Sequence, residues 1–172
     1  MEFLTTIKEQ LPGWAKDIRL NLDAVIARST LAPEDAVGAA LSAAYAARSP
    51  VLVEAFKSGL SEGDANAALT ASALMGMNNT WYPYVEMTGD AQLKSLPAQL
   101  RMNAYATHGG VDKKRFELFA LVASIIGKCH FCVASHYENL KNDGLSTEQL
   151  RDAGRIAAVV NAAALALAAQ GK

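Results

Sequence analysis

The chain has 172 residues, of which 51% are hydrophobic and 7% aromatic, and its formal net charge is −1. This length suits one domain with a substantial core, and a nearly neutral charge without a basic face excludes nucleic acid as a partner. Alanine dominates and strand-length runs of β-branched residues are nearly absent. We therefore expect a single all-α domain over residues 1–172.

The ends of the chain give no sign of export or membrane insertion. The N-terminal MEFLTTIKEQ lacks a charged region followed by an apolar one, so we expect no signal peptide. The most apolar run, Ile156 to Ala169, is too short and too Ala-rich to span a bilayer, and Asn161 interrupts it. We expect a soluble, cytoplasmic protein with no membrane partner. In such a reducing compartment, two cysteines are more often catalytic than structural.

The first half of the chain predicts four helices from the spacing of apolar residues, first-turn prolines and capping residues. The helices are expected at 12–28, 34–48, 51–58 and from Ser61 to about Trp81. The second is made almost entirely of small apolar residues and should be buried. Pro83 should end the fourth helix, because proline lacks the N–H that continues a helix.

The second half predicts a loop and four further helices. In chain order these are the loop 85–98, a short helix at 100–105, and longer helices at 112–127, 129–141 and 147–169. Asp112 is the expected N-cap of the first long helix, and Ser146 with Gln149 forms a capping box for the last. The basic run Lys113–Arg115 should form a solvated face.

The stretch that carries the chemistry contains the only two cysteines, Cys129 and Cys132, in a Cys-x-x-Cys arrangement. His136 follows four residues after the second cysteine, and Glu117 lies on the preceding predicted helix. Residues three and four apart share one face of a helix, so the two thiols and the imidazole should form one column. Two thiols beside a base suit redox or nucleophilic chemistry.

Three interpretations fit this column. The cysteines could be small apolar core residues, because free cysteine is often buried. They could bind zinc with His136 and Glu117, although structural zinc sites usually draw on a second separated pair that this chain lacks. They could form a redox dithiol whose thiolate is stabilised by a helix N-terminus and by neighbouring Lys128. We favour the redox dithiol.

Glu117, the run Cys129–Cys132 and His136 together resemble the active-site signature of the AhpD-type alkyl hydroperoxidases. These proteins belong to the wider carboxymuconolactone decarboxylase-like family. Three other stretches also resemble AhpD proteins, so that essentially the whole chain is covered: LPGWAKDIRLNL (11–22), MGMNNTWY (75–82) and LRMNAYA (100–106). The match is therefore far more specific than a lone Cys-x-x-Cys.

The resemblance implies an all-α fold of two similar halves, at about 11–85 and 100–170, with only the second half catalytic. The triplet Gly-Leu-Ser occurs at 59–61 and again at 144–146, 85 residues later, which fits such a repeat. At that offset Cys129, Cys132 and His136 fall on Ala44, Ala47 and Val51. The first half would then be a scaffold without the chemistry.

The resemblance also implies roles for the four residues. Cys132 would attack the peroxide and become a sulfenic acid, and Cys129 would protonate the leaving group and then close the redox disulfide. His136 would accept the proton of Cys132, and Glu117 would hold the imidazole. Cys132 would also form the interchain disulfide with a peroxiredoxin.

The implied partners follow from the same resemblance. AhpD proteins are weak peroxidases whose main role is to reduce the peroxiredoxin AhpC with electrons from dihydrolipoamide, carried by a 2-oxoacid dehydrogenase acyltransferase, and they are usually homotrimers. The chain has no Gly-rich dinucleotide fingerprint after a strand, so we expect no NAD(P)H, flavin or other tightly bound cofactor, and no metal. A lactone decarboxylase or isomerase is the alternative, disfavoured because such relatives generally lack the dithiol.

One position departs from the family pattern. The better-known AhpD sequences carry a histidine where this chain has Phe131, and His130 lies one place earlier, about 100° around the helix from Cys129. We therefore assign no relay role to Phe131 or His130, and expect the relay to rest on Glu117 and His136 or to use water. Met75 is expected to fill the core. Tyr82 could line a pocket for a hydrophobic substrate, but we favour a place in a helix-end core or a subunit interface.

Overall fold

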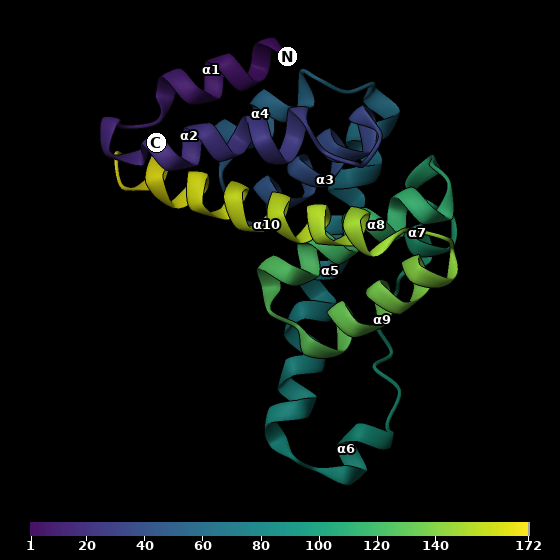
Figure 1. Cartoon of the computed structure of the whole chain (residues 1–172). Coiled ribbons are helices and arrows are strands. Elements are labelled where there is room, and N and C mark those ends of the chain that lie inside the picture. The colour runs from purple at the N-terminus through teal and green to yellow at the C-terminus, as the bar shows by residue number, and fades with distance from the viewer. Residues whose placement is uncertain (172) are drawn as a thin grey trace.

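The computed structural model describes residues 1–171, and within them the chain is helical without a strand, which confirms the expected all-α class (Figure 1). The α-helices are α1 (Glu2–Gln10), α2 (Lys16–Leu22), α3 (Pro33–Ala46), α4 (Pro50–Lys57), α5 (Glu62–Thr88), α6 (Ala91–Ser95), α7 (Asn103–Ala106), α8 (Lys113–Gly127), α9 (His130–Asn142) and α10 (Thr147–Ala168). Shorter helical turns lie at η1 (Gly13–Ala15), η2 (Asp23–Ala27) and η3 (His108–Gly110). None of the helices in this part of the chain is both long and apolar enough to cross a bilayer.

Helices α3 and α8 form the centre of the core, and each packs against the other and against α5 and α10. The small residues of α3 allow this close approach, and most of the helix is buried as the sequence predicts. Gly38 is one point of close contact, because a side chain there would overlap the ring of Phe119 on α8. Helix α9, which carries the cysteines, packs on α8 and α5 beside this core.

Pro83 does not end its helix, and the prediction at this point is wrong. Helix α5 continues to Thr88 and stops at Gly89, which adopts the left-handed conformation with φ 64°. A proline removes only one backbone hydrogen bond, and tertiary contacts hold the adjacent turns. Asn79 donates a hydrogen bond to the carbonyl of Ala123 on α8, and Tyr82 stacks on Phe131 of α9.

Two other boundaries also differ from the sequence predictions. The expected loop 85–98 contains the end of α5 and the short helix α6. The expected helix 12–28 is divided into η1, α2 and η2, and Trp14 is 70% exposed, outside the buried face formed by Leu22, Val25 and Ile26. The N-terminal helix α1 has no counterpart among the predictions. It buries Leu4 and Ile7.

The α3–α4 junction and the α8–α9 junction share the same local geometry. Arg48 and Lys128, 80 residues apart, both adopt left-handed backbone conformations, with φ of 59° and 55°. The next residues, Ser49 and Cys129, are N-caps whose side chains accept a hydrogen bond from the backbone N–H three residues later. The matching offset here is 80 rather than 85, because α9 is longer than α4, and so Cys129 corresponds to Ser49 and not to Ala44.

The sequence predicts a solvated face at Lys113–Arg115. The structure contradicts this for Arg115, which forms ion pairs between helices. Its guanidinium lies 2.6 Å from Asp35 of α3 and 2.6 Å from Asp64 of α5, with an 18% exposed side chain. Replacing it with alanine should lower the free energy of unfolding by about 2 kcal/mol, because two partly buried carboxylates lose their partner. Urea unfolding measures this change.

The neighbouring exposed residue provides the control. Lys114→Ala removes a positive charge one position earlier and should change the unfolding free energy by less than about 0.5 kcal/mol. Equal losses in the two variants would show that net charge, and not the ion pairs between helices, is responsible.

Candidate active site

Cys129 and Cys132 are joined by a disulfide with an S–S distance of 2.11 Å and a Cα–Cα distance of 5.3 Å. Cys129 is the N-cap of α9 and Cys132 lies in the first turn. The helix begins here because Lys128 takes a left-handed conformation at the end of α8 and reverses the chain direction. The structure thus brings the two sulfurs together at a helix N-terminus.

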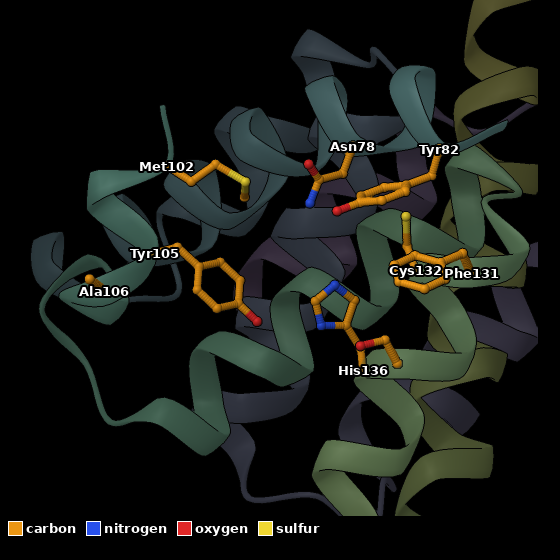
Figure 2. A pocket seen from close by; sticks show the side chains of 9 residues that line it. Asn78, Tyr82, Met102, Tyr105, Ala106, Phe131, Cys132 and His136 are labelled. Carbon is orange, nitrogen blue, oxygen red and sulfur yellow. The ribbon is translucent and has the colours of Figure 1, made fainter. Parts of the chain in front are cut away.

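A cavity of about 330 Å³ lies beside the disulfide (Figure 2). Its lining comes from α5, α7, the segment before α7, and α9: Asn78, Tyr82, Met102, Tyr105, Ala106, Phe131, Cys132, Ser135 and His136. Cys132 borders this cavity, whereas Cys129 is fully buried and does not. A molecule in the cavity therefore meets the sulfur of Cys132 first.

The surroundings of Cys129 suit a sulfur that changes its charge. Its Sγ accepts a hydrogen bond from the backbone N–H of Cys132 at 3.3 Å, at the N-terminus of a 13-residue helix. Such a position stabilises a thiolate. The same Sγ lies 3.9 Å from the carbonyl oxygen of Asn78, which can accept a hydrogen bond when this sulfur carries a hydrogen.

Glu117 and His136 form a buried pair beside the cavity. His136 Nδ1 lies 2.7 Å from Glu117 Oε2, and Glu117 is 1% exposed. Asn139 donates a second hydrogen bond to Oε2 at 3.3 Å, and the Tyr105 hydroxyl donates to Oε1. Burial acts to raise the pKa of Glu117, but the hydrogen bonds from His136, Tyr105 and Asn139 outweigh it, so that the pKa is lowered from its ordinary value.

Both nitrogens of the His136 ring face acceptors. Nδ1 faces the carboxylate and Nε2 lies 3.2 Å from the sulfur of Met75. Because a carboxylate only accepts hydrogen bonds, Nδ1 carries the hydrogen that is donated to Glu117, and Nε2 is the nitrogen that can take up a proton. Met75 is fully buried and fills the core as expected, but it also contacts this ring. Among the described residues, no hydrogen bond links His136 to either sulfur.

Phe131 lines the cavity, whereas the neighbouring His130 lies outside it. Phe131 stacks on Tyr82 with ring centroids 4.5 Å apart, is 57% exposed and lines the cavity. His130 is on the outside of α9, where its side chain is 82% exposed and its Nδ1 lies 3.4 Å from Glu86. His130 thus points away from the cavity. At position 131, where the better-known AhpD sequences carry a histidine, the apolar ring of Phe131 lines the cavity.

Tyr105 and Asn139 are neighbours of Glu117 that the sequence did not predict. Asn139 lies three residues after His136 on the same helix, a spacing that shares a face and could have drawn attention to it. Tyr105 belongs to the LRMNAYA stretch, but nothing in its local pattern shows that α7 packs on α5 and η3 with the Tyr105 side chain against α8. Only the tertiary structure brings its hydroxyl to the carboxylate.

The fold and the site together define an all-α protein with a disulfide-forming dithiol at a helix N-terminus, a buried carboxylate–imidazole pair and a mostly apolar cavity between them. Comparison with known proteins places this arrangement in a family. The profile of the Carboxymuconolactone decarboxylase family matches residues 91–170. The matched segment contains all four residues of the site.

Relatives match over nearly the whole chain. The chain is 42% identical over 172 residues to the alkyl hydroperoxide reductase AhpD of Rhodospirillum centenum, covering 97% of this chain and 91% of the relative. It is 41% identical over 171 residues to AhpD of Maricaulis maris, covering 97% and 98%. It is 39% identical over 165 residues to AhpD of Coxiella burnetii strain RSA 493, covering 92% and 93%. The chain therefore belongs to the AhpD proteins of the carboxymuconolactone decarboxylase family.

Proposed function

We propose that this protein is a peroxide-reducing oxidoreductase with an antioxidant role, which reduces alkyl hydroperoxides and regenerates an AhpC-type peroxiredoxin. The observation that carries the proposal is the Cys129–Cys132 disulfide beside a cavity that also reaches His136. The relatives named alkyl hydroperoxide reductase AhpD support the substrate class. A lactone decarboxylase has no use for such a disulfide.

The reductive half of the proposed cycle begins at Cys132. One thiolate of dihydrolipoamide, on the lipoyl group of an acyltransferase, attacks the Cys132 sulfur, and the bond to Cys129 breaks. Cys129 leaves as a thiolate at the N-terminus of α9 and takes up a proton. The second lipoyl thiol then displaces Cys132. The products are the cyclic disulfide of lipoamide and a reduced protein dithiol, so two electrons pass to the protein.

The oxidative half uses the same two sulfurs. His136 accepts the proton of Cys132, and the resulting thiolate attacks the peroxide. The O–O bond breaks, Cys132 becomes a sulfenic acid, and the alkoxide takes the proton of Cys129 to leave as an alcohol. The Cys129 thiolate then attacks the sulfenic sulfur. Hydroxide leaves as water with the proton from His136, and the disulfide is restored.

Glu117 supports this relay in the proposed mechanism. It stabilises the imidazolium that forms when His136 takes the Cys132 proton, and its fixed hydrogen bond to Nδ1 leaves Nε2 for proton transfer. The contact between Nε2 and Met75 is one that a thiolate or a water molecule in the cavity can replace. Regeneration of a peroxiredoxin would use the same thiolate, through a mixed disulfide with Cys132.

A coupled assay tests the proposal. Peroxide consumption is followed with dihydrolipoamide as reductant, with and without an AhpC-type peroxiredoxin. We expect consumption that depends on lipoamide and increases when the peroxiredoxin is added. Absence of lipoamide-dependent turnover in both arms, from protein whose dithiol titrates fully, would contradict the proposal.

We also propose that the protein is cytoplasmic and forms a homotrimer. The segment around α6 lies at the far end of the molecule, away from the main body (Figure 1). It exposes apolar side chains, with Met87 79%, Leu96 56% and Leu100 41% accessible. Exposed apolar residues gathered on one segment are typical of association surfaces. Sedimentation equilibrium distinguishes a trimer from a monomer.

The stacked rings of Phe131 and Tyr82, which line the cavity, predict a preference for apolar peroxides. Phe131→Ala should lower kcat/KM for cumene hydroperoxide about tenfold, because the apolar ligand loses an aromatic contact, and should change the value for hydrogen peroxide less than about twofold. His130→Ala, one residue away and outside the cavity, is the matched control and should leave both values unchanged. Equal losses for the two peroxides would show that Phe131 does not select the substrate.

A further inference from the structure

Tyr105 makes an unusual connection between the cavity wall and the buried carboxylate. Its ring lines the cavity and packs edge-on against Phe116, with ring centroids 5.5 Å apart. Its hydroxyl donates a hydrogen bond to Oε1 of Glu117, and its ring centroid lies 6.4 Å from that of His136. Figure 2 shows the hydroxyl directed toward His136, at the side of the cavity opposite Phe131.

The two carboxylate oxygens of Glu117 accept hydrogen bonds from different helices. Oε2 accepts hydrogen bonds from His136 and Asn139, both on α9. Oε1 accepts from Tyr105 on α7. Among the described residues this is the one hydrogen bond that a side chain of α7 makes to another helix. A buried carboxylate oxygen without a hydrogen-bond donor favours the protonated acid. The hydrogen bond from Tyr105 therefore stabilises the ionised form of Glu117.

We propose that Tyr105 is a positioning residue of the relay: its hydroxyl holds Glu117 as a carboxylate toward His136 and thereby sets the pH range in which Cys132 is reactive. The inference rests on the proposed roles of Cys132, His136 and Glu117. It also links the position of α7 over the cavity to the charge state of the pair. The donor on Oε1 is present only while α7 holds Tyr105 against Glu117.

The surrounding groups are compatible with this role. The titratable side chains that face Glu117 are Tyr105 from α7 and His136 from α9, and Asn139 from α9 is uncharged. On the α5 side, Met75 contacts the imidazole and carries no charge. Burial, together with the hydrogen bond to Glu117 and its negative charge, raises the pKa of Tyr105. The phenol therefore stays a donor over the whole working range of pH.

Tyr105→Phe tests the proposal, because it removes the hydroxyl and keeps the ring that packs on Phe116. Two pH profiles are measured: lipoamide-dependent peroxide reduction, and alkylation of the reduced dithiol by iodoacetamide. We expect kcat/KM at neutral pH to fall about tenfold. We also expect the acid limb of the activity profile and the midpoint of alkylation at Cys132 both to move to higher pH by about half a unit or more.

The direction of the shift follows from the charge of Glu117. Without the donor on Oε1 the acid form is favoured, the imidazolium is less stabilised, and Cys132 loses its proton only at higher pH. Tyr137→Phe on α9 removes the hydroxyl of a partly exposed tyrosine outside the cavity and should leave both profiles unchanged. Profiles of Tyr105→Phe that overlay the wild type, even at a lower rate, would overturn the proposal.

The two readouts separate this inference from the proposed function. If the wild type reduces no peroxide with lipoamide, the proposed function fails, while the alkylation midpoint still reports whether Tyr105 acts on Cys132. If the wild type is active and the alkylation midpoint of Tyr105→Phe does not move, the role of Tyr105 fails and the proposed function stands. Circular dichroism establishes that the variant is folded.

Discussion

Replacing Cys132 with serine should abolish lipoamide-dependent peroxide reduction, with a loss of at least about a thousandfold, because the hydroxyl of serine replaces the sulfur that attacks the peroxide. The residue borders the cavity, whereas its partner Cys129 is enclosed. The measurement is peroxide consumption with dihydrolipoamide at saturating reductant. Full activity of the variant would show that the assignment of the attacking sulfur is wrong.

Cys129→Ser provides the matched variant, because it keeps the attacking sulfur and removes the resolving one. Steady turnover should also be lost, but one equivalent of peroxide should still convert Cys132 to a sulfenic acid that dimedone can trap. Cys132→Ser should give no trapped adduct. A trapped adduct on Cys129 in Cys132→Ser would reverse the roles of the two cysteines.

Replacing Glu117 with glutamine should reduce kcat/KM about 10- to 100-fold at neutral pH, since the neutral amide no longer stabilises the imidazolium. Glutamine has nearly the size and shape of glutamate, so the fall in kcat/KM measures the effect of the lost negative charge. Glu86→Gln is the matched control: it neutralises the carboxylate beside the exposed His130 and should leave the rate unchanged. Equal rates for Glu117→Gln and the wild type would remove Glu117 from the relay.

The same substitution should change stability in a pH-dependent way. The pKa of Glu117 is lowered in the folded protein, so the ionised carboxylate stabilises the fold above its unfolded value of about 4.3, and this contribution is lost as the pH falls through the folded value. Glu117→Gln should therefore unfold more easily than the wild type at pH 7, by about 1–3 kcal/mol, and the difference should narrow in acid. Urea unfolding at several pH values measures the change.

Much of the site could be predicted from local sequence because its main residues lie on two consecutive helices. The three- and four-residue spacings of Cys129, Cys132 and His136 fix a common helical face, and the caps at Asp112 and Cys129 set where the helices begin. The structure brings Glu117 to His136 across the α8–α9 turn. Periodicity and capping are local properties, and they are readable without the fold.

The remaining features depend on contacts between distant segments. Tyr105 reaches Glu117 only because α7 packs on α5 and η3 beside α8, and the charge cluster at Arg115 forms only when three helices meet. Pro83 lies inside a helix since neighbouring helices hold the turns on either side of it. In each case a tertiary contact outweighs a local preference, and the sequence pattern contains no signal for it.

The two matching helix junctions share a backbone geometry but carry different side chains. At the 80-residue offset, Ser49 stands for Cys129, Leu52 for Cys132 and Phe56 for His136, and Val37 takes the place of Glu117. These four counterparts are all buried. The backbone at the α3–α4 turn is therefore maintained by an oxygen cap and plain hydrocarbon neighbours. One chain path thus holds a hydroxyl cap at the first turn and a disulfide at the second, so the side chains and not the backbone decide which turn can carry a dithiol.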